Sequence, residues 1–314
     1  MDRPFISVCL LAHNSASYIT TALESIRAQS FEDWELLISD DASTDGTESL
    51  IEPHLKDSRI RYVLHRENIK QAKNWAYAIE STSAPLITTL HADDAWEPDA
   101  LQTFANAFRQ QTDLDLAWSN WDYYDPGLKI RERSAPVTIS KEMNGNDACS
   151  WLLDNNHALP SAAAFTREVA RRAGSPDPRF GMLCDRRYFL QLALAARRCR
   201  AIPKVLVRYR QNEGGVTSTF TSSGRLQEEM ILFANDAENL FQRHPHGSAL
   251  AKRLRSGLGK DLFLHGLGAL LAGDRPRGTR WMKKAAELAR WRLLEPSSLR
   301  GVARTLKRRI VGAI

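Results

Sequence analysis

The first 110 residues alternate between short apolar runs and longer segments with helical spacing, and this alternation limits the folds open to the chain. Apolar runs rich in β-forming residues predict strands at Phe5–Leu11, Trp34–Ser39, Arg59–His65 and Pro85–His91. Amphipathic segments predict helices at Ser15–Gln29, Thr44–Leu55, Gln71–Glu80 and Asp99–Gln110. Strands that alternate with helices through short connections are typical of a mostly parallel sheet covered by helices. The sequence therefore predicts an α/β fold.

The pattern loosens after residue 110. Asp115–Asn120 predicts one more strand, whereas residues 121–165 mix Pro, Gly, Asn and Asp with short apolar runs. Such a mixture indicates loops and edge elements rather than another strand–helix repeat. Regular structure is predicted again at Asp185–Cys199, as a helix, and at Lys204–Arg210, as a short strand.

The C-terminal part of the chain is predicted to be helical and is strongly basic. From Arg225 onward the sequence predicts helices, with breaks at Pro245, Gly273–Pro276 and Pro296. The 314-residue chain has a net charge of +6, but residues 243–314 hold 17 Lys and Arg against 4 Asp and Glu. We therefore expect a domain over 1–225, divided into halves 1–115 and 116–225, and a basic helical tail over 226–314.

The basic tail allows two interpretations. Amphipathic basic segments with tryptophan at their edge, such as Arg280–Leu294, suit the surface of an anionic membrane. A helical subdomain that packs on the domain, with its arginines in solvent, accounts for the same pattern. The sequence contains no helix–turn–helix, RNA-binding or zinc motif beside the charge, so it does not favour a nucleic-acid partner.

Cysteine usage and hydropathy indicate the compartment. The four cysteines are scattered and lack the spacing of a metal site or a disulfide framework. The N-terminus lacks the long apolar region of a signal peptide. No stretch reaches the roughly 18–20 apolar residues of a membrane span. We therefore expect a cytoplasmic protein, held peripherally at the inner face of the cell membrane if its tail binds there.

Polar side chains follow three of the predicted strands. His13 and Asn14 follow the first strand, Asp40-Asp41 end the second, and Asp93-Asp94 follow the fourth. Ligands of open parallel sheets bind beyond the carboxyl ends of the strands. Carboxylates that converge there repel one another unless a cation neutralises them, and Mg²⁺ or Mn²⁺ with substrate phosphates is a common solution. The alternative is that these acids only cap the following helices.

Other nucleotide-binding and catalytic motifs are absent from the sequence. No GxGxxG follows the first strand, and no GxxxxGK[ST], GxSxG or HExxH occurs. A nucleotide bound by this chain would therefore have its phosphates neutralised by a metal and basic side chains rather than by a glycine-rich loop.

Several short motifs succeed one another between residues 7 and 101. They are Ser7-Val8, His13-Asn14, Gln29-Ser30-Phe31, Trp34-Glu35-Leu36, Asp40-Asp41-Ala42-Ser43-Thr44-Asp45-Gly46-Thr47, Lys73-Asn74 and Ala92-Asp93-Asp94. In this order and spacing the chain resembles the family 2 glycosyltransferases of the GT-A fold. The resemblance is dense over residues 4–110 and sparse over 160–218. It implies an inverting, nucleotide-sugar-dependent enzyme that uses Mg²⁺ or Mn²⁺.

The resemblance also implies roles for individual residues. Asp41 would accept a hydrogen bond from a uracil-type base, Asp93 would meet the ribose and the metal, and Asp94 would be the main metal ligand. Asp185 falls where the family places its general base. The donor-binding residues that the resemblance implies are Leu11, His13, Asn14, Asp41, Asn68, Lys73, Asp93 and Arg210.

Two residues depart from the family pattern, and the role of Asp185 has an alternative. His91 stands where an acid is frequent, which favours a single main carboxylate ligand, and Asn212 stands where a histidine is usual. Asp185 opens a predicted helix, so an N-cap role without catalysis explains its presence as well. The tryptophans Trp118, Trp121 and Trp151 would suit a sugar-stacking platform on the acceptor side, and packing in the core is the alternative for Trp118.

These observations together predict an inverting glycosyltransferase. It would move a sugar from a nucleoside-diphosphate donor, with UDP expected, to a glycan or lipid-linked glycan acceptor in surface polysaccharide or lipopolysaccharide assembly. Two alternatives remain at this level. A nucleotidyltransferase also uses acidic pairs and a metal, although the usual glycine-rich loop is absent here, and a non-catalytic scaffold could bind nucleotide sugars with the same residues.

Overall fold

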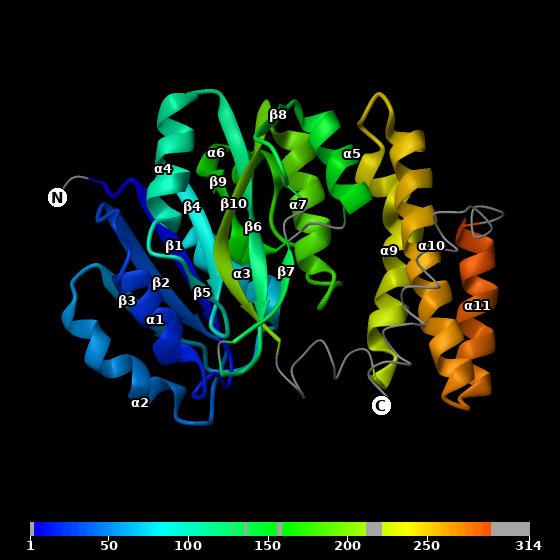
Figure 1. Ribbon diagram of the computed structural model, residues 1–314, viewed down its shortest axis with the longest axis horizontal. Coiled ribbons are helices and arrows are strands. Elements are labelled where there is room, and N and C mark those ends of the chain that lie inside the picture. The colour runs from blue at the N-terminus through cyan, green and yellow to red at the C-terminus, as the bar shows by residue number, and fades with distance from the viewer. Residues whose placement is uncertain (1–2, 128, 135–136, 156–158, 212–221, 290–314) are drawn as a thin grey trace. The chain divides into compact units, whose positions relative to one another are not determined.

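The computed structural model describes residues 3–289, apart from 128, 135–136, 156–158 and 212–221. The chain divides into two compact units, Met1–Gly215 (unit 1) and Val216–Ile314 (unit 2). Unit 1 is a sheet flanked by helices, and the described part of unit 2 is helical (Figure 1). The boundary predicted from the sequence, after residue 225, falls at the first residue of helix α9 (Arg225–Phe241).

A ten-stranded sheet forms the centre of unit 1, in the order β3-β2-β1-β4-β9-β6-β10-β5, with β7 beside β6 and β8 beside β10. Strands β1 to β4 pair in parallel, as do β6 and β10, whereas β9 runs antiparallel between β4 and β6. The parallel first half confirms the predicted α/β class. The strands are β1 Ile6–Ala12, β2 Trp34–Asp40, β3 Ile60–Leu64, β4 Leu86–His91, β5 Ala95–Trp96, β6 Leu114–Tyr124, β7 Ile130–Ser134, β8 Lys141–Met143, β9 Ala163–Thr166 and β10 Arg198–Arg210.

Helices cover both faces of this sheet because successive side chains of a strand point to opposite sides. Ile6, Val8 and Leu10 of β1 belong to one hydrophobic cluster with residues of α1 and α4, while α3 packs against β1 and β2 and contacts α7. Trp75 of α3 meets Tyr188 of α7 edge to face, with ring centroids 5.0 Å apart. The helices of unit 1 are α1 Ile19–Arg27, α2 Thr47–Ile51, α3 Gln71–Glu80, α4 Ala100–Gln110, α5 Gly145–Asn155, α6 Arg167–Ala173 and α7 Cys184–Ala195, with 3₁₀ turns at Glu52–Lys56 and Pro160–Ala162.

Some predicted boundaries differ from the structure for local reasons. Helix α1 begins at Ile19 rather than Ser15, because the Ser15 carbonyl accepts from Tyr18 N (2.9 Å) and Ile19 N (2.8 Å) in a preceding turn. The predicted second helix is divided between α2 and a 3₁₀ turn that contains Pro53. Strand β10 is longer than predicted and shifts its register with β6 around Pro203, which has no N–H to donate.

The loosely patterned stretch 121–165 is more regular than the sequence predicts. It holds β7, β8, helix α5 and part of β9. Helix α5 buries Ala148, Cys149, Leu152 and Leu153. This spacing is helical and was visible in the sequence, but the surrounding Asn, Asp and Gly residues masked it.

Unit 2 contains three described helices that pack on one another, α9, α10 (Gly247–Leu271) and α11 (Arg275–Ala289) (Figure 1). The breaks predicted at Pro245 and at Gly273–Pro276 coincide with the connections between them, whereas Pro296 lies outside the described residues. Within the described ranges, no helix combines the length and the apolar character that crossing a bilayer requires.

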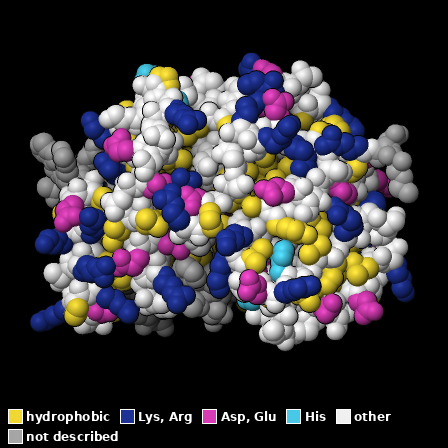
Figure 2. All heavy atoms as spheres, turned by 180° about the vertical axis from the view of Figure 1, so that it is seen from behind, with side chains coloured by type: hydrophobic (Ala, Val, Ile, Leu, Met, Phe, Trp, Pro, Cys, Tyr) yellow, Lys and Arg dark blue, Asp and Glu magenta, His cyan; other side chains and the backbone are white. Residues whose placement is uncertain are grey.

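The surface mixes charges of both signs. On the face that Figure 2 shows, Lys and Arg side chains lie among Asp and Glu side chains rather than as one basic surface. Residues 290–314, which hold seven Lys and Arg against one Glu, are outside the described part of the chain.

Candidate active site

Strained backbone marks the loops that follow β1, β2 and β3. Among the described residues other than glycine, positive φ angles occur at Asn14 (49°), Ala42 (60°) and Lys70 (75°). L-residues adopt this region at a cost, and such residues cluster at functional sites because surrounding contacts must hold them there. All three lie in these loops at the carboxyl ends of neighbouring parallel strands.

Side chains join the first two of these loops. Asn14 N donates to Ser43 Oγ (2.8 Å), and Thr44 N donates to Asn14 Oδ1 (2.9 Å). His13 Nδ1 lies 2.7 Å from the carbonyl oxygen of Asp41. His13 and Asn14 after β1 therefore hold the loop of Asp41 to Thr44 after β2 in place.

The contacts of His13 determine its tautomer. Because a carbonyl oxygen only accepts, Nδ1 carries the proton in the hydrogen bond to Asp41. Nε2 then offers one lone pair, for which Asn68 Nδ2 at 3.2 Å and Asn14 Nδ2 at 3.3 Å are the neighbouring donors. The structure thus brings together three of the predicted donor-binding residues, His13, Asn14 and Asn68, in one exposed group.

Asp41 lies beneath this group and binds the third loop. Its carboxylate accepts from the backbone N–H groups of Ile69 (2.6 Å) and Lys70 (3.0 Å), and its side chain is buried. The neighbouring Asp40 is also buried and accepts from Ser43 N (2.9 Å) and Tyr62 Oη (3.0 Å). Asp40 is therefore a structural residue, while Asp41 holds the strained Lys70 loop beside the candidate donor site.

Two further predicted donor-binding residues lie close by in the fold. Leu11 is nearly buried in β1, in register with His91 of β4. Lys73 is exposed on the first turn of α3. Its neighbour Asn74 anchors that turn to β2, because Asn74 Nδ2 donates to the Ser39 carbonyl (3.0 Å).

A second group of polar side chains lies after β4. One ring nitrogen of His91 and one carboxylate oxygen from each of Asp93 and Asp94 lie within 4.8 Å of one another. Asp94 is buried and accepts from Ser161 Oγ (2.6 Å) and from the backbone N–H of Arg210 (3.2 Å). We call His91, Asp93 and Asp94 the metal corner.

The electrostatics of the metal corner favour a bound cation. Burial, and then the charge of Asp93, raise the pKa of Asp94 well above its ordinary value. Burial lowers the pKa of His91, against the opposing charge of Asp93, and so favours the neutral imidazole that binds metals. His91 Nε2 is buried and lacks a hydrogen-bond partner. Two carboxylates and a neutral imidazole with an orphaned nitrogen fit a divalent cation.

The structure brings His91 close to both acids of the metal corner. Whether one carboxylate is the main ligand, as the replacement of an acid by His91 suggests, stays a prediction, and the end of β4 places the imidazole near the carboxylates of Asp93 and Asp94. Strand alternation does not explain this placement, because β4 ends at His91 and the chain then turns, with Asp94 N donating to the His91 carbonyl (3.0 Å).

Arg210 joins β10 to the metal corner. It is buried, and its Nε donates to the Asp93 carbonyl (2.9 Å) while Nη1 donates to the carbonyl of Pro126. Its guanidinium carbon lies 5.0 Å from the ring centroid of Tyr18. Arg210, a predicted donor-binding residue, thus stabilises the backbone of the metal corner through its hydrogen bond to the Asp93 carbonyl.

Asp185 is in the first turn of α7, but it is not the N-cap. The helix begins at Cys184 with Leu183 as its N-cap residue, so Asp185 is a first-turn acid, and a role at the helix start without catalysis stays an alternative. Asp185 Oδ1 accepts from Arg186 N (2.5 Å). Burial and the charges of Asp94, Asp93 and Asp185 raise the pKa of Tyr209 on β10.

Trp118, one of the three tryptophans expected as candidates for sugar stacking, belongs to the core. It is buried on β6, and its ring centroid lies 5.3 Å from that of Trp151. Trp121 is also largely buried and meets Tyr123 edge to face at 6.3 Å. Both positions favour the core interpretation over a sugar platform.

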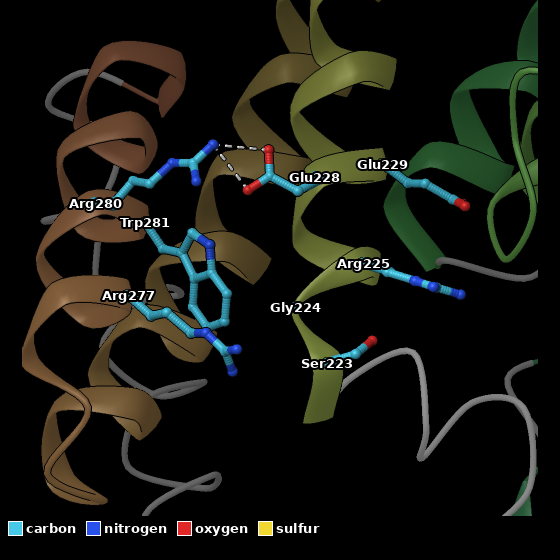
Figure 3. A pocket seen from close by; sticks show the side chains of 8 residues that line it. All are labelled: Ser223, Gly224, Arg225, Glu228, Glu229, Arg277, Arg280 and Trp281. Carbon is cyan, nitrogen blue, oxygen red and sulfur yellow. Dashed lines mark hydrogen bonds and ion pairs between the residues drawn. The ribbon is translucent and has the colours of Figure 1, made fainter.

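A cavity of about 480 Å³ lies within unit 2, between the start of α9 and helix α11 (Figure 3). The Arg280 guanidinium pairs with Glu228 at 3.0 Å, and Arg277 Nη1 donates to the Ser222 carbonyl at 3.2 Å. Trp281 is nearly buried and packs so closely on Gly224 that an added Cβ would lie 3.2 Å from its ring. These contacts hold helix α11 against the start of α9.

Comparison with known proteins identifies the family. The sequence model of the family "Glycosyl transferase family 2" matches residues 7–174. This span includes the residues around His13 and Asp41 and the metal corner. Asp185 and Arg210 lie beyond it. The chain therefore belongs to glycosyl transferase family 2, and its fold is of the GT-A type.

Individual relatives are bacterial glycosyltransferases by name. The chain is 35% identical over 101 residues to the putative teichuronic acid biosynthesis glycosyltransferase TuaG of Bacillus subtilis (strain 168), covering 32% of this chain and 40% of TuaG. It is 30% identical over 128 residues to the putative glycosyltransferase EpsH of the same strain, covering 40% of this chain and 37% of EpsH. The matched region therefore spans about two fifths of each relative.

Solved structures show the same fold at low identity. S. aureus TarS 1-349 in complex with UDP-GlcNAc has a TM-score of 0.70 at 16% identity, covering 92% of this chain and 82% of that one. The mannosyltransferase PcManGT of Pyrobaculum calidifontis, in complex with GDP-Man and Mn²⁺, has a TM-score of 0.60 at 17% identity, covering 98% and 85%.

Proposed function

We propose that this chain is an inverting glycosyltransferase that uses a UDP-sugar donor and a divalent cation. The observation that carries the proposal is the metal corner, which lies at the same edge of the parallel strands as the strained group around His13 and Asp41. A nucleoside diphosphate has a base at one end and phosphates at the other. The polar residues around His13 and Asp41 suit the base, and the metal corner suits the phosphates. The TarS complex with UDP-GlcNAc supports the choice of UDP.

The residues would divide the work as follows. His13, Asn68 and Asp41, with Leu11 and Lys73 nearby, would hold the base and ribose. Asp93 and Asp94 would hold the cation, and Arg210 would keep Asp93 in place through its backbone. A bound cation would stabilise the negative charge that grows on the leaving diphosphate.

Asp185 would act as the general base. Inversion is a single displacement at the anomeric carbon, in which the acceptor oxygen bonds to the sugar as the bond to the diphosphate breaks. The carboxylate of Asp185 would take the proton of the acceptor hydroxyl as this bond forms. The position of Asp185 in the first turn of α7, where the family resemblance expects the base, supports this role.

The acceptor would be a glycan or a lipid-linked glycan in surface polysaccharide or teichoic acid assembly. The name of TuaG supports this setting, as does the basic charge of residues 243–314. The tail would hold the enzyme at an anionic membrane on the cytoplasmic side, where lipid-linked acceptors and nucleotide sugars meet.

The test is a screen of nucleotide sugars with the purified chain, with and without Mn²⁺. We expect Mn²⁺-dependent binding or hydrolysis of a UDP-sugar, measured by calorimetry and by release of UDP. A preference for GDP-sugars would reject the UDP assignment. Pyrophosphate release from a nucleoside triphosphate and a sugar phosphate would instead favour nucleotidyl transfer.

A further inference from the structure

His91 occupies an unusual place for a side chain without a partner. Its Nε2 atom is shielded from solvent and lacks a hydrogen bond, and a ring nitrogen of the residue lies within 4.8 Å of carboxylate oxygens of Asp93 and Asp94. A buried polar atom without a partner is costly, so native proteins rarely keep one unless a ligand, an ion or a water satisfies it.

The fold holds His91 and Asp94 in a defined relation. The backbone N–H of His91 donates to Ser161 Oγ (3.2 Å), and the same hydroxyl donates to Asp94 Oδ2 (2.6 Å). Strand pairing with β1 fixes the other side of His91, which is in register with Leu11. The backbone of His91 and the carboxylate of Asp94 are therefore positioned by the fold itself, as a binding site requires.

We propose that His91 is a third protein ligand of the cation, so that the metal corner prefers Mn²⁺ and Co²⁺ to Mg²⁺. The proposal for His91 rests on the proposed function in one respect, namely that the metal corner is the cation site. Oxygen-only sites suit Mg²⁺, which keeps its waters and prefers carboxylates and phosphates. An imidazole nitrogen beside two carboxylate oxygens raises the affinity for later divalent metals, which bind nitrogen more strongly.

The first test measures Mn²⁺ binding to the full chain by electron paramagnetic resonance, with and without UDP. In the His91→Leu variant we expect the Mn²⁺ affinity to fall by at least about tenfold, since even outer partners of a metal change affinity by 10–100-fold. In the wild-type chain, an imidazole nitrogen bound directly to Mn²⁺ should modulate the electron spin echo. In His91→Leu this modulation should disappear. The control is His54→Gln, because His54 Nδ1 is likewise buried and without a partner but is outside the metal corner.

The second test uses His91→Asp, which restores an oxygen ligand. We expect the ratio of Mg²⁺ to Mn²⁺ affinity, measured by competition, to rise by about tenfold over the wild-type ratio. A residue that only fills space at the end of β4 would change neither the ratio nor the nitrogen signal. Circular dichroism of each variant establishes that the fold is retained.

The outcomes separate this proposal from the function itself. Absence of a nitrogen signal from Mn²⁺ bound to the wild-type chain, or absence of Mn²⁺ binding, would overturn the role of His91. UDP-sugar turnover that persists in His91→Leu while Asp94→Asn abolishes it would leave the glycosyltransferase proposal intact. Lack of any nucleotide-sugar binding by the wild-type chain would count against the proposed function instead.

Discussion

Asp185 lies in the first turn of α7, where its backbone environment differs little from that of other helical acids, such as Asp147 in the first turn of α5. The two residues therefore make a matched pair. If Asp185 takes the acceptor proton, its loss changes the reaction, whereas the loss of Asp147 changes only a helix start.

For Asp185→Asn we expect sugar transfer to fall by about 10²–10⁴-fold, because that is the usual contribution of a general base. The affinity for the donor should change little, since an amide of the same shape replaces the carboxylate. The measurements are the rate of transfer and the dissociation constant of the UDP-sugar. Asp147→Asn should leave both unchanged, and an unaltered rate in Asp185→Asn would reject its role as base.

Ala42 offers a test of backbone strain at the donor loops. At a φ of 60° an alanine pays a penalty of about 1–2 kcal/mol that glycine avoids, partly offset by the greater freedom of glycine in the unfolded chain. We expect Ala42→Gly to raise the free energy of unfolding by about 0.5–1 kcal/mol in urea denaturation. Ala28→Gly, at an ordinary φ of −82°, should lower it instead.

At the scale of elements, Asp115 ties three parts of unit 1 together. On β6 it is buried, and it accepts from Arg172 Nη2 of α6 (2.7 Å) and Thr166 Oγ1 (3.2 Å). It also accepts from the backbone N–H of Arg197, just before β10 (2.8 Å). The sequence places Asp115 at the start of a strand but does not reveal these partners, which lie 51–82 residues away along the chain.

We expect Asp115→Asn to lower the free energy of unfolding by about 2 kcal/mol at neutral pH, because two guanidinium groups lose a buried carboxylate. Burial alone would raise the pKa of Asp115, but the hydrogen bonds and charges of Arg197 and Arg172 lower it below its ordinary value. The wild-type contribution is therefore complete above about pH 4 and is lost as the pH falls through the lowered pKa.

Urea denaturation of wild type and Asp115→Asn between pH 2 and pH 7 measures this contribution. The two curves of stability against pH should converge in acid. The exposed Asp113, which pairs with Arg198 at 2.9 Å, provides the control, and Asp113→Asn should cause little change at any pH. Parallel curves for Asp115→Asn would contradict the assignment.

At the scale of the whole molecule, the tail is the part whose role depends most on charge. Residues 290–314 carry seven Lys and Arg and one Glu, and each basic residue near an anionic surface contributes about 1 kcal/mol of attraction. We expect a chain that ends at residue 289 to float with anionic vesicles at least about tenfold less than the full chain. Neutral vesicles serve as the comparison, and equal flotation of both chains with anionic vesicles would contradict a membrane role for these residues.

The type and order of the elements over residues 5–110 could be predicted from the sequence because hydrophobic spacing is local. The helix Gln71–Glu80 has the predicted bounds, and the polar residues after β1, β2 and β4 are read directly from the chain. The predicted donor-binding residues gather for the same reason, since the ends of neighbouring parallel strands meet at one edge.

Which distant residues complete the site was decided only by the tertiary structure. Strand β9 inserts between β4 and β6 and brings Ser161 to Asp94, and β10 returns to place Arg210 against Asp93. His91 joins the metal corner through the same contacts. Periodicity tells which side of a strand a residue faces but not which strand becomes its neighbour, because pairing over such separations depends on the packing of the whole sheet.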